Sequence, residues 1–210
     1  MPTIAEKRSA FRRLHERGCF VIPNPWDIGT ARYLQHLDFK ALATTSAGAA
    51  FSLGRPDNET VTRDDMLAHI KTIVDASDLP VNADYESGYA HEPAKLAENV
   101  RLCVETGVAG LSIEDNSGQS EEPLYDFDLA VERITAARKA INDSGIPVIL
   151  TARCEAWLVG DADPLSTSLE RLVAFADAGA DCLYAPGVTD SEEISAIVDA
   201  VAPKIGRAHV

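Results

Sequence analysis

The most constraining feature of this sequence is a repeat of short apolar segments, each followed by a loop and a stretch with helical spacing of apolar residues. The apolar segments are continuous rather than alternating, which is typical of parallel strands covered on both faces. They lie at residues 19–24, 41–48, 80–88, 110–116, 147–156 and 182–187. The repeat predicts six βα units and therefore a parallel α/β sheet.

Local signals predict several helix boundaries. The pairs Thr62–Asp65 and Thr167–Glu170 have the spacing of capping boxes, which predicts that helices begin after Thr62 and Thr167. Glycine at the end of a helical stretch favours the left-handed conformation that stops a helix. Such stops are predicted at Gly107, Gly145 and Gly179.

The fold is either an open doubly wound sheet or a barrel. No GxGxxG follows the first strand and no GxxxxGK[ST] is present, so the two common nucleotide-binding open sheets lose support. A (β/α)8 TIM barrel is the better prediction, although such barrels typically have about 250 residues. With 210 residues, the chain is expected to be a single barrel domain over residues 1–204, truncated after the sixth βα unit.

The last six residues support that expectation. Residues 205–210 read IGRAHV, a hexapeptide that ATCGGAAGAGCACACGTC can encode. That nucleotide sequence matches a widely used sequencing adapter. We therefore expect residues 205–210 to be a non-native tail and the domain to be incomplete at its C-terminus, which resequencing of the source gene tests.

Composition limits the partners of the chain. The net charge is −14 and the pI about 4.7, which argues against nucleic acid and against an anionic membrane as partners. The sequence has no apolar run of membrane-spanning length and no signal-peptide core, so we expect a cytoplasmic protein. The four cysteines show no CxxC spacing and are expected to be reduced core residues.

Polar side chains follow four of the predicted strands. Residues 44–48, TTSAG, end the first of these strands, and Asp84 and Glu86 end the next one two positions apart. Glu114 ends the third, and Arg153 with Glu155 ends the fourth. Side chains two positions apart on a strand lie on the same face of the sheet. In parallel α/β folds the active site lies at the C-terminal ends of the strands. Crowded carboxylates favour a cation, and oxygen ligands suit Mg²⁺ or Mn²⁺. Arg153 could bind an anionic substrate, or could itself balance part of the acidic charge.

Six motifs in order give a resemblance to a known family. They read NPWDIGTARYL, TTSAGAAFSLGRPD, ADYESGYA, SIEDN, LTARCEA and GADCLYAPG. Together they resemble the isocitrate lyase/phosphoenolpyruvate mutase superfamily over residues 20–204. The resemblance implies a (β/α)8 barrel that binds Mg²⁺ and a small α-keto acid or its enolate, and that breaks or rearranges a C–C or P–C bond beside it.

The resemblance also implies roles for individual residues. A first group would hold the substrate carboxylate and the enolate oxygen: Ser46 with the backbone at Ala47 and Gly48. A second group would form the metal site: Asp84, Glu86 and Glu114. Asp57 matches an active-site aspartate of the family, and Arg153 matches the arginine that contacts the leaving portion of the substrate. Glu114 is expected to act in catalysis together with these two.

Two departures from the family pattern reduce the number of activities expected for this chain. The KKCGH loop of isocitrate and methylisocitrate lyases is absent, and so is the KxxxKxNS loop of the mutase. We expect a Mg²⁺-dependent lyase that cleaves a C–C bond next to an enolate in a small 2-oxo or 2-hydroxy carboxylate, of oxaloacetate decarboxylase or substituted-malate lyase type. The alternatives are a P–C bond isomerase or hydrolase, and a non-catalytic metabolite-binding barrel or inactive fragment. A full-length form is expected to be a homodimer or homotetramer.

Overall fold

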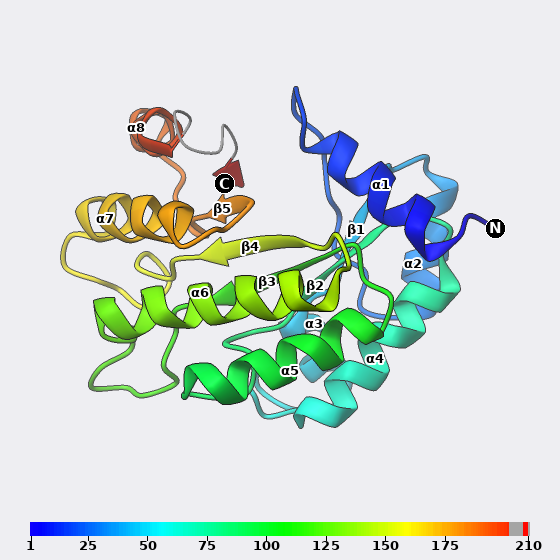
Figure 1. Cartoon of the computed structure of the whole chain (residues 1–210), viewed down its shortest axis with the longest axis horizontal. Coiled ribbons are helices and arrows are strands. Elements are labelled where there is room, and N and C mark those ends of the chain that lie inside the picture. The colour runs from blue at the N-terminus through cyan, green and yellow to red at the C-terminus, as the bar shows by residue number, and fades with distance from the viewer. Residues whose placement is uncertain (202–207, 210) are drawn as a thin grey trace.

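A curled sheet of parallel strands runs through the middle of the molecule, and helices α4 to α7 pack along its outer side (Figure 1). The computed structural model describes residues 1–201 and 208–209. Strand order in the sheet follows chain order. The strands are β1 (Leu42–Ala43), β2 (Val81–Asp84), β3 (Gly110–Glu114), β4 (Ile149–Arg153), β5 (Cys182–Tyr184) and β6 (Ala208–His209). The predicted α/β class is confirmed, with the strands forming a curled half-barrel of the TIM-barrel type.

Helices lie between these strands, with α1 and α2 before β1 and both α3 and α4 between β1 and β2. They are α1 (Ile4–Leu14), α2 (Ile28–His36), α3 (Ser46–Ser52), α4 (Arg63–Ala76), α5 (Pro93–Glu105), α6 (Phe127–Ser144), α7 (Pro164–Asp177) and α8 (Ser191–Val201). The predicted start of α4 is confirmed, because the Asp65 backbone N–H donates to Thr62 Oγ1 at 3.2 Å. The start predicted after Thr167 is wrong. Asp163 caps α7 by accepting from the Ser166 N–H, and Pro164 occupies the first turn, where its missing N–H costs nothing.

The three predicted helix stops are confirmed. Gly145 directly follows α6 with φ +67°, and Gly107 and Gly179 lie just beyond α5 and α7 with φ +96° and +102°. A β-carbon on Gly179 would lie 2.8 Å from Cγ of Arg138, so this turn tolerates no side chain.

The first predicted strand, residues 19–24, is not a strand of the sheet. The segment runs beside β1, and it is joined to β1 by the backbone hydrogen bond from the Ala43 N–H to the Pro23 carbonyl, at 3.0 Å, and by the Asn24 side-chain amide, which donates to the Ala43 carbonyl at 3.2 Å. Proline has no N–H to donate to a ladder, and two prolines, Pro23 and Pro25, lie at the end of this segment. The count of six predicted βα units is therefore wrong at the first strand, while the other five predicted strands are present as β1 to β5.

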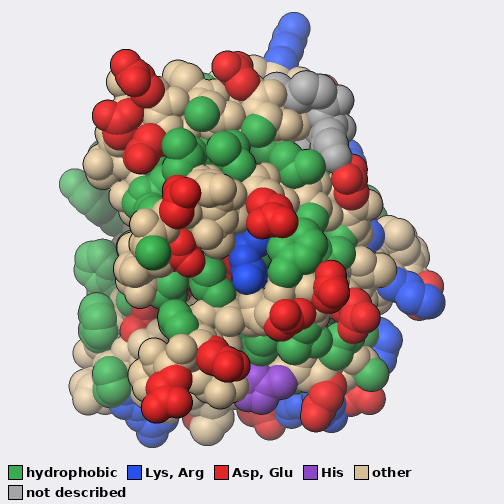
Figure 2. Space-filling model, turned by 90° about the vertical axis from the view of Figure 1, so that its left-hand side faces the viewer, with side chains coloured by type: hydrophobic (Ala, Val, Ile, Leu, Met, Phe, Trp, Pro, Cys, Tyr) green, Lys and Arg blue, Asp and Glu red, His purple; other side chains and the backbone are tan. Residues whose placement is uncertain are grey.

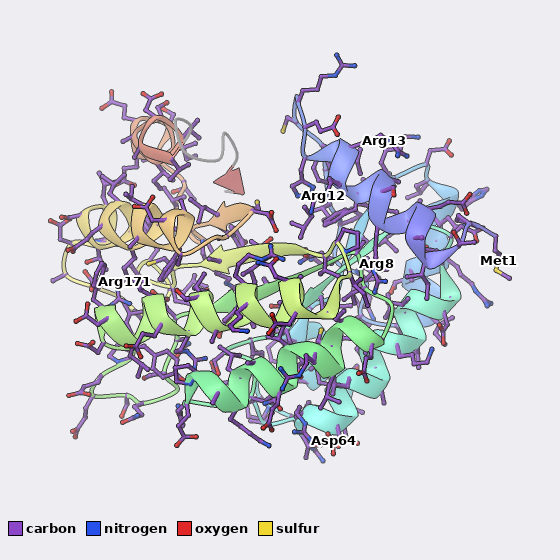
Figure 3. All side chains as sticks on the ribbon, in the orientation of Figure 1. Met1, Arg8, Arg12, Arg13, Asp64 and Arg171 are labelled. Carbon is purple, nitrogen blue, oxygen red and sulfur yellow. The ribbon has the colours of Figure 1, made fainter. Side chains whose placement is uncertain are left out.

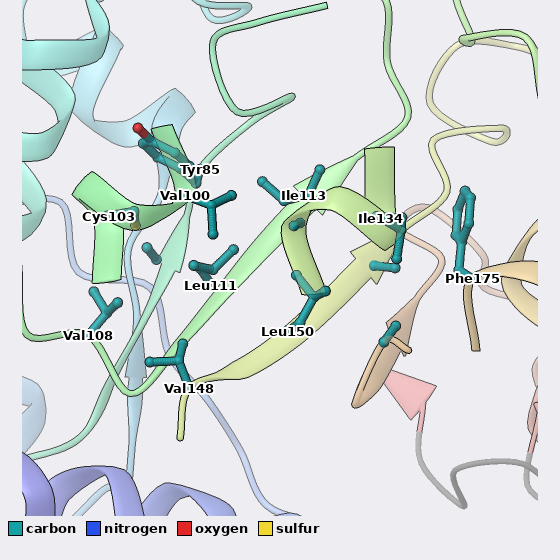
Figure 4. Close-up of a cluster of buried hydrophobic side chains, with 14 of the residues drawn as sticks. Tyr85, Val100, Cys103, Val108, Leu111, Ile113, Ile134, Val148, Leu150 and Phe175 are labelled. Atoms are coloured by element: carbon teal, nitrogen blue, oxygen red, sulfur yellow. The ribbon is translucent and has the colours of Figure 1, made fainter. Parts of the chain in front are cut away.

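The core lies mainly between the outer face of the sheet and the helices. Leu111, Ile113 and Leu150 of the central strands are at most 1% exposed and pack in one large buried cluster with side chains of α5, α6 and α7 (Figure 4). A smaller cluster on the inner side contains Phe11 of α1 together with Ile149. This packing holds α1 against one end of the sheet.

Hydrogen bonds also fasten α1. Figure 3 shows Arg8 on α1, and its guanidinium donates to the carbonyls of Val104 and Val108, both at 2.9 Å. The cysteines are all free thiols, as expected, and three of them are buried. The expectation of a core position is wrong for Cys19, which is exposed because it lies in the segment that does not join the sheet.

Residues 205–207 and 210 of the predicted tail lie outside the described residues. Residues 208–209 form β6, which pairs in parallel with β5. The proposal that the tail is non-native stays a prediction. Among the described residues, no helix combines the length and the apolar character needed to cross a membrane.

Candidate active site

A polar pocket opens where the strands end. Its volume is about 160 Å³. Its lining residues are Ser46, Asp57, Asn58, Glu86, Glu114, Asn116, Arg153, Glu155, Leu158 and Val159. Figure 2 faces the side of the molecule toward which β4 points, and shows basic side-chain atoms at its centre with acidic groups nearby. The carboxyl ends of the strands therefore bring residues from distant parts of the chain to one place.

Arg153 at the end of β4 lies among three carboxylates. Its Nη1 is 3.5 Å from Asp84 Oδ1, its Nε is 3.7 Å from Glu114 Oε2, and its Nε donates to Glu155 Oε1. Glu114 reaches Arg153 because the two residues are register partners across β3 and β4. One guanidinium thus faces three acidic groups, which leaves an excess of negative charge when all three are ionised.

Burial and neighbouring charges shift the pKa values of Arg153 and of the carboxylates Glu114 and Glu155. Burial raises the pKa of Glu114 well above its ordinary value, against the opposing effect of Arg153. Burial likewise raises the pKa of Glu155. Burial alone would lower the pKa of Arg153, but Asp84, Glu114 and Glu155 outweigh it and raise the pKa. Arg153 therefore stays protonated, and the carboxylates carry the cost of crowding.

Asp84 is fixed by the neighbouring strand end. Its Oδ2 accepts from the backbone N–H of Ser46 at 2.9 Å and from the Ser46 hydroxyl at 3.0 Å. The Asp84 backbone N–H donates to Thr44 Oγ1 at 2.9 Å. Its Oδ1 is buried and has no hydrogen-bond partner among the described residues. Ser46 thus orients Asp84 so that its other carboxylate oxygen makes no hydrogen bond and faces Arg153 Nη1 at 3.5 Å.

Ala47 and Gly48 lie in the first turn of α3, and the packing of this turn explains why a glycine is present at position 48. Thr45 caps this helix by accepting from the Gly48 N–H at 3.1 Å. A β-carbon on Gly48 would lie 2.6 Å from Cγ2 of Thr45 and 3.0 Å from Cβ of Trp26, so glycine is needed for packing. Of the three residues predicted to hold the substrate carboxylate, Ser46 lines the pocket. The binding role of Ala47 and Gly48 stays a prediction.

Asp115 is a buried residue that stabilises the backbone next to the pocket. It is 3% exposed, and its Oδ1 accepts from the Glu155 N–H at 2.8 Å. Its Oδ2 accepts from Arg171 Nη1 at 3.1 Å, and Arg171 Nη2 also donates to the Tyr125 carbonyl at 2.7 Å. Figure 3 shows Arg171 on α7, on the same side of the molecule as the strand ends. This bridge ties β3, β4 and α7 together and so fixes the backbone that carries Glu155.

Glu86 and Asp57 enter the pocket from two loops. The chain leaves the strand conformation after Asp84, and Glu86 has φ +48°, so the predicted period-two relation between Asp84 and Glu86 does not hold. Burial raises the pKa of Glu86 to about 7. Its Oε1 accepts from the Tyr89 hydroxyl at 2.7 Å and its Oε2 from the Glu59 N–H. Asp57 Oδ1 is buried without a hydrogen-bond partner among the described residues.

The carboxylate oxygens of the pocket decide whether it could bind a divalent cation. In the part of the chain that the structure describes, no three His, Cys, Asp or Glu side chains are arranged to hold an ion by themselves. Mg²⁺, however, is commonly held by one or two carboxylates together with water and substrate oxygens. Asp84 Oδ1, which has no hydrogen bond and shares the Arg153 charge with Glu114 and Glu155, and the excess negative charge fit a divalent cation bound in that way.

The structure brings the predicted residues Ser46, Asp57, Glu86, Glu114 and Arg153 to one pocket, with Asp84 in contact with two of them. Their catalytic and metal-binding roles stay predictions. Sequence reasoning missed Asn58, Leu158 and Val159 as pocket residues, and it gave no role to Asn116 of the SIEDN motif. Because the three missed residues lie in loops, no periodic pattern marks them.

Comparisons with known proteins found a matching family model and several similar proteins. A family model described as phosphoenolpyruvate phosphomutase matches residues 11–208. A solved structure from Burkholderia cenocepacia J2315, described provisionally as a lyase/mutase, is 52% identical, superposes with a TM-score of 0.91, and covers 97% of this chain and 71% of its own length.

Curated relatives are more distant. An uncharacterised protein of Mycobacterium tuberculosis is 35% identical over 89% of this chain and 68% of its own length. The 2-methylisocitrate lyase of Escherichia coli K12 is 31% identical over 80% of this chain and 57% of its own length. Other relatives at 30% to 32% identity are named oxaloacetate decarboxylase and 2,3-dimethylmalate lyase. The chain thus spans between half and three-quarters of the length of these proteins.

Proposed function

The chain belongs to the isocitrate lyase/phosphoenolpyruvate mutase superfamily, and on that premise we propose that it is a Mg²⁺-dependent carbon–carbon lyase for a small 2-oxo or 2-hydroxy carboxylate. The observation that carries the proposal is the placement of Arg153 among Asp84, Glu114 and Glu155 in a small polar pocket. A pocket of about 160 Å³ suits a compact acid. The named relatives near 30% identity include lyases and decarboxylases, which favours this class, and also an oxaloacetate acetylhydrolase, which acts on a small 2-oxo acid.

The residues of the chain divide the work as follows. Arg153 binds a carboxylate of the substrate, on the portion that leaves. Asp57, through its unpartnered Oδ1, takes the proton of a substrate hydroxyl where the substrate has one. The C–C bond then breaks, the electron pair stays on the enolate portion, and the other portion leaves as a carbonyl compound. For a 2-oxo acid such as oxaloacetate, the same electron pair is left as carbon dioxide departs, and no hydroxyl proton is removed.

A divalent cation would be held by Asp84 with Glu114, and when bound it stabilises the negative charge on the enolate oxygen. Ser46 keeps Asp84 in place through two hydrogen bonds. Leu158 and Val159 form an apolar part of the pocket wall, beside which a small alkyl substituent would fit. This wall is compatible with a substituted malate as well as with oxaloacetate.

The test is turnover of a panel of 2-oxo and 2-hydroxy acids by the purified protein with Mg²⁺ or Mn²⁺. We expect at least one acid to be cleaved, and the activity to be lost on chelation and restored by added metal. Failure to cleave any member of a broad panel under these conditions contradicts the proposal.

A second candidate is a P–C bond isomerase, because the matching family model is described as a phosphomutase and one similar structure as a lyase/mutase. Phosphorus NMR of a reaction with phosphonopyruvate separates the two. Conversion of the phosphonate signal to a phosphate ester signal would favour the mutase, and an unchanged phosphonate signal alongside cleavage of a carbon acid favours the lyase.

A further inference from the structure

A hydrogen-bond network beside the pocket joins two irregular segments. One is residues 54–61, called here the 54–61 loop, which follows α3. The other is residues 85–91, called here the 85–91 segment, which follows β2. Both contain non-glycine residues with left-handed backbone conformation. These are Asn58 at φ +69°, Glu59 at +53°, Glu86 at +48° and Tyr89 at +59°. Such residues are uncommon, and the surrounding structure has to hold them.

The 85–91 segment is a fixed platform. Arg133 of α6 is 1% exposed, and its guanidinium donates to the carbonyls of Ser87, Ala90 and His91. Asn99 of α5 donates to the carbonyls of Gly88 at 2.9 Å and Tyr89 at 3.1 Å. The Glu114 N–H donates to the Glu86 carbonyl at 3.0 Å. Three separate elements therefore immobilise this backbone.

Two glutamates fasten the 54–61 loop to that platform. Glu86 Oε2 accepts from the Glu59 N–H of the loop. In return, Glu59 Oε1 accepts from the Ser87 hydroxyl and from the Tyr89 N–H, the latter at 3.1 Å. The Tyr89 hydroxyl donates to Glu86 Oε1 at 2.7 Å and sets the orientation of the Glu86 carboxylate. Each oxygen of Glu86, which is 4% exposed, thus accepts a hydrogen bond.

The fastened loop delivers two residues to the pocket. Asp57 and Asn58 precede Glu59 directly, and both line the pocket. Because Asp57 Oδ1 has no hydrogen-bond partner among the described residues, the position of this atom is set by the backbone of the loop. We propose that Glu86 is a positioning residue, which holds the 54–61 loop closed and so places Asp57 and Asn58 in the pocket, rather than a ligand of the cation.

The catalytic importance of this closure rests on the proposed lyase function, but the closure itself does not. The two roles of Glu86 make opposite predictions for a glutamine. In Glu86→Gln the side-chain oxygen still accepts from the Glu59 N–H and the amide nitrogen donates to the Tyr89 hydroxyl, so closure is kept while the charge is lost. A metal ligand needs that charge, whereas a positioning residue does not.

The experiment measures hydrogen exchange in peptides that cover the 54–61 loop, together with Mn²⁺ affinity by electron paramagnetic resonance. The proteins compared are wild type, Glu86→Ala, Glu86→Gln and Glu59→Ala. The matched control is Glu92→Ala, since Glu92 is exposed on the same connection and its side chain makes no capping bond. Kinetics on the best substrate of the acid panel complete the set.

We expect Glu86→Ala and Glu59→Ala to speed exchange of the loop by about tenfold or more, while exchange in the strands is unchanged. Glu86→Gln and the control should match wild type within about twofold, and Mn²⁺ affinity should be retained in both Glu86 variants. With an active substrate, Glu86→Ala should lower kcat about tenfold or more and Glu86→Gln should restore most of it.

Two results would overturn the proposal. One is loop exchange in Glu86→Ala equal to wild type. The other is a loss of Mn²⁺ affinity in Glu86→Gln as large as in Glu86→Ala, which would make Glu86 a ligand. If the wild-type protein turns over no acid and binds no Mn²⁺, the lyase proposal fails while loop exchange still decides the role of Glu86. If Glu86→Ala does not fold, Glu59→Ala tests the companion hydrogen bonds of the same closure, those that Glu59 Oε1 accepts from Ser87 and Tyr89, and Glu86→Gln still decides whether Glu86 is a ligand.

Discussion

Arg133 offers the sharpest test of how the platform beside the pocket is held. Its guanidinium is buried and donates to three backbone carbonyls, those of Ser87, Ala90 and His91. Replacing it with leucine leaves three acceptors without their partner, the buried carbonyl of Ser87 and the part-buried carbonyls of Ala90 and His91, at about 1 kcal/mol each at the low end of the usual range. The low end applies because burial lowers the pKa of Arg133, so the cation itself pays a desolvation cost that leucine removes.

We therefore expect Arg133→Leu to lower the free energy of unfolding by about 3 kcal/mol, which for a chain of this size lowers Tm by about 6–12 °C. Urea titration and thermal melting followed by circular dichroism measure this. Arg101→Leu on the exposed side of α5 is the matched control and should stay within about 0.5 kcal/mol of wild type. An unfolding free energy of Arg133→Leu that also stays within about 0.5 kcal/mol of wild type would refute the reasoning.

Three further predictions concern other positions. Gly88→Ala should destabilise the fold by about 2 kcal/mol or more in urea titration, since φ is +84° and the new β-carbon would lie 2.1 Å from Cδ1 of Leu96; equal urea midpoints would contradict this. Arg153→Lys should raise KM for the carboxylate substrate about tenfold or more without unfolding the protein, because lysine lacks the planar fork; steady-state kinetics with an unchanged KM would count against the binding role. Burial lowers the pKa of His69, so the unfolded chain takes up a proton at this residue at a higher pH than the folded protein does. Stability from this residue is present above the unfolded pKa of about 6.5 and is lost as pH falls below it, so wild type should lose more stability than His69→Leu between about pH 7.5 and 5.5, and parallel losses would contradict the assignment.

The sheet and the gathering of charges at its edge could be predicted from the sequence. Continuous apolar runs identify buried parallel strands, and the rule that strand ends meet at one edge brings Asp84, Glu114 and Arg153 together. The prediction failed where local chemistry overrides an apolar pattern. Residues 19–24 are apolar enough for a strand. Proline has no N–H to donate, however, so the prolines at the end of this segment prevent a regular ladder of hydrogen bonds to β1.

The parts that could not be predicted depend on contacts between distant residues. Arg133 reads as one of several charges on an amphipathic helix, and nothing local indicates that its partners are the backbone carbonyls of a loop. The left-handed turn at Glu86 is equally unmarked, because glutamate rarely adopts it. As a result, the sequence places Glu86 beside Asp84 on one face, whereas the structure turns its carboxylate toward Glu59 and Tyr89.

The central claim is that the crowded carboxylates around Arg153 are arranged for a divalent cation and a small acid. The most direct measurement is a titration of Mn²⁺ into the protein, followed by electron paramagnetic resonance, with and without oxalate as an enolate mimic. We predict saturable binding that oxalate tightens and that Asp84→Ala weakens about tenfold or more. Absence of saturable binding, or equal affinity in wild type and Asp84→Ala, would contradict the account.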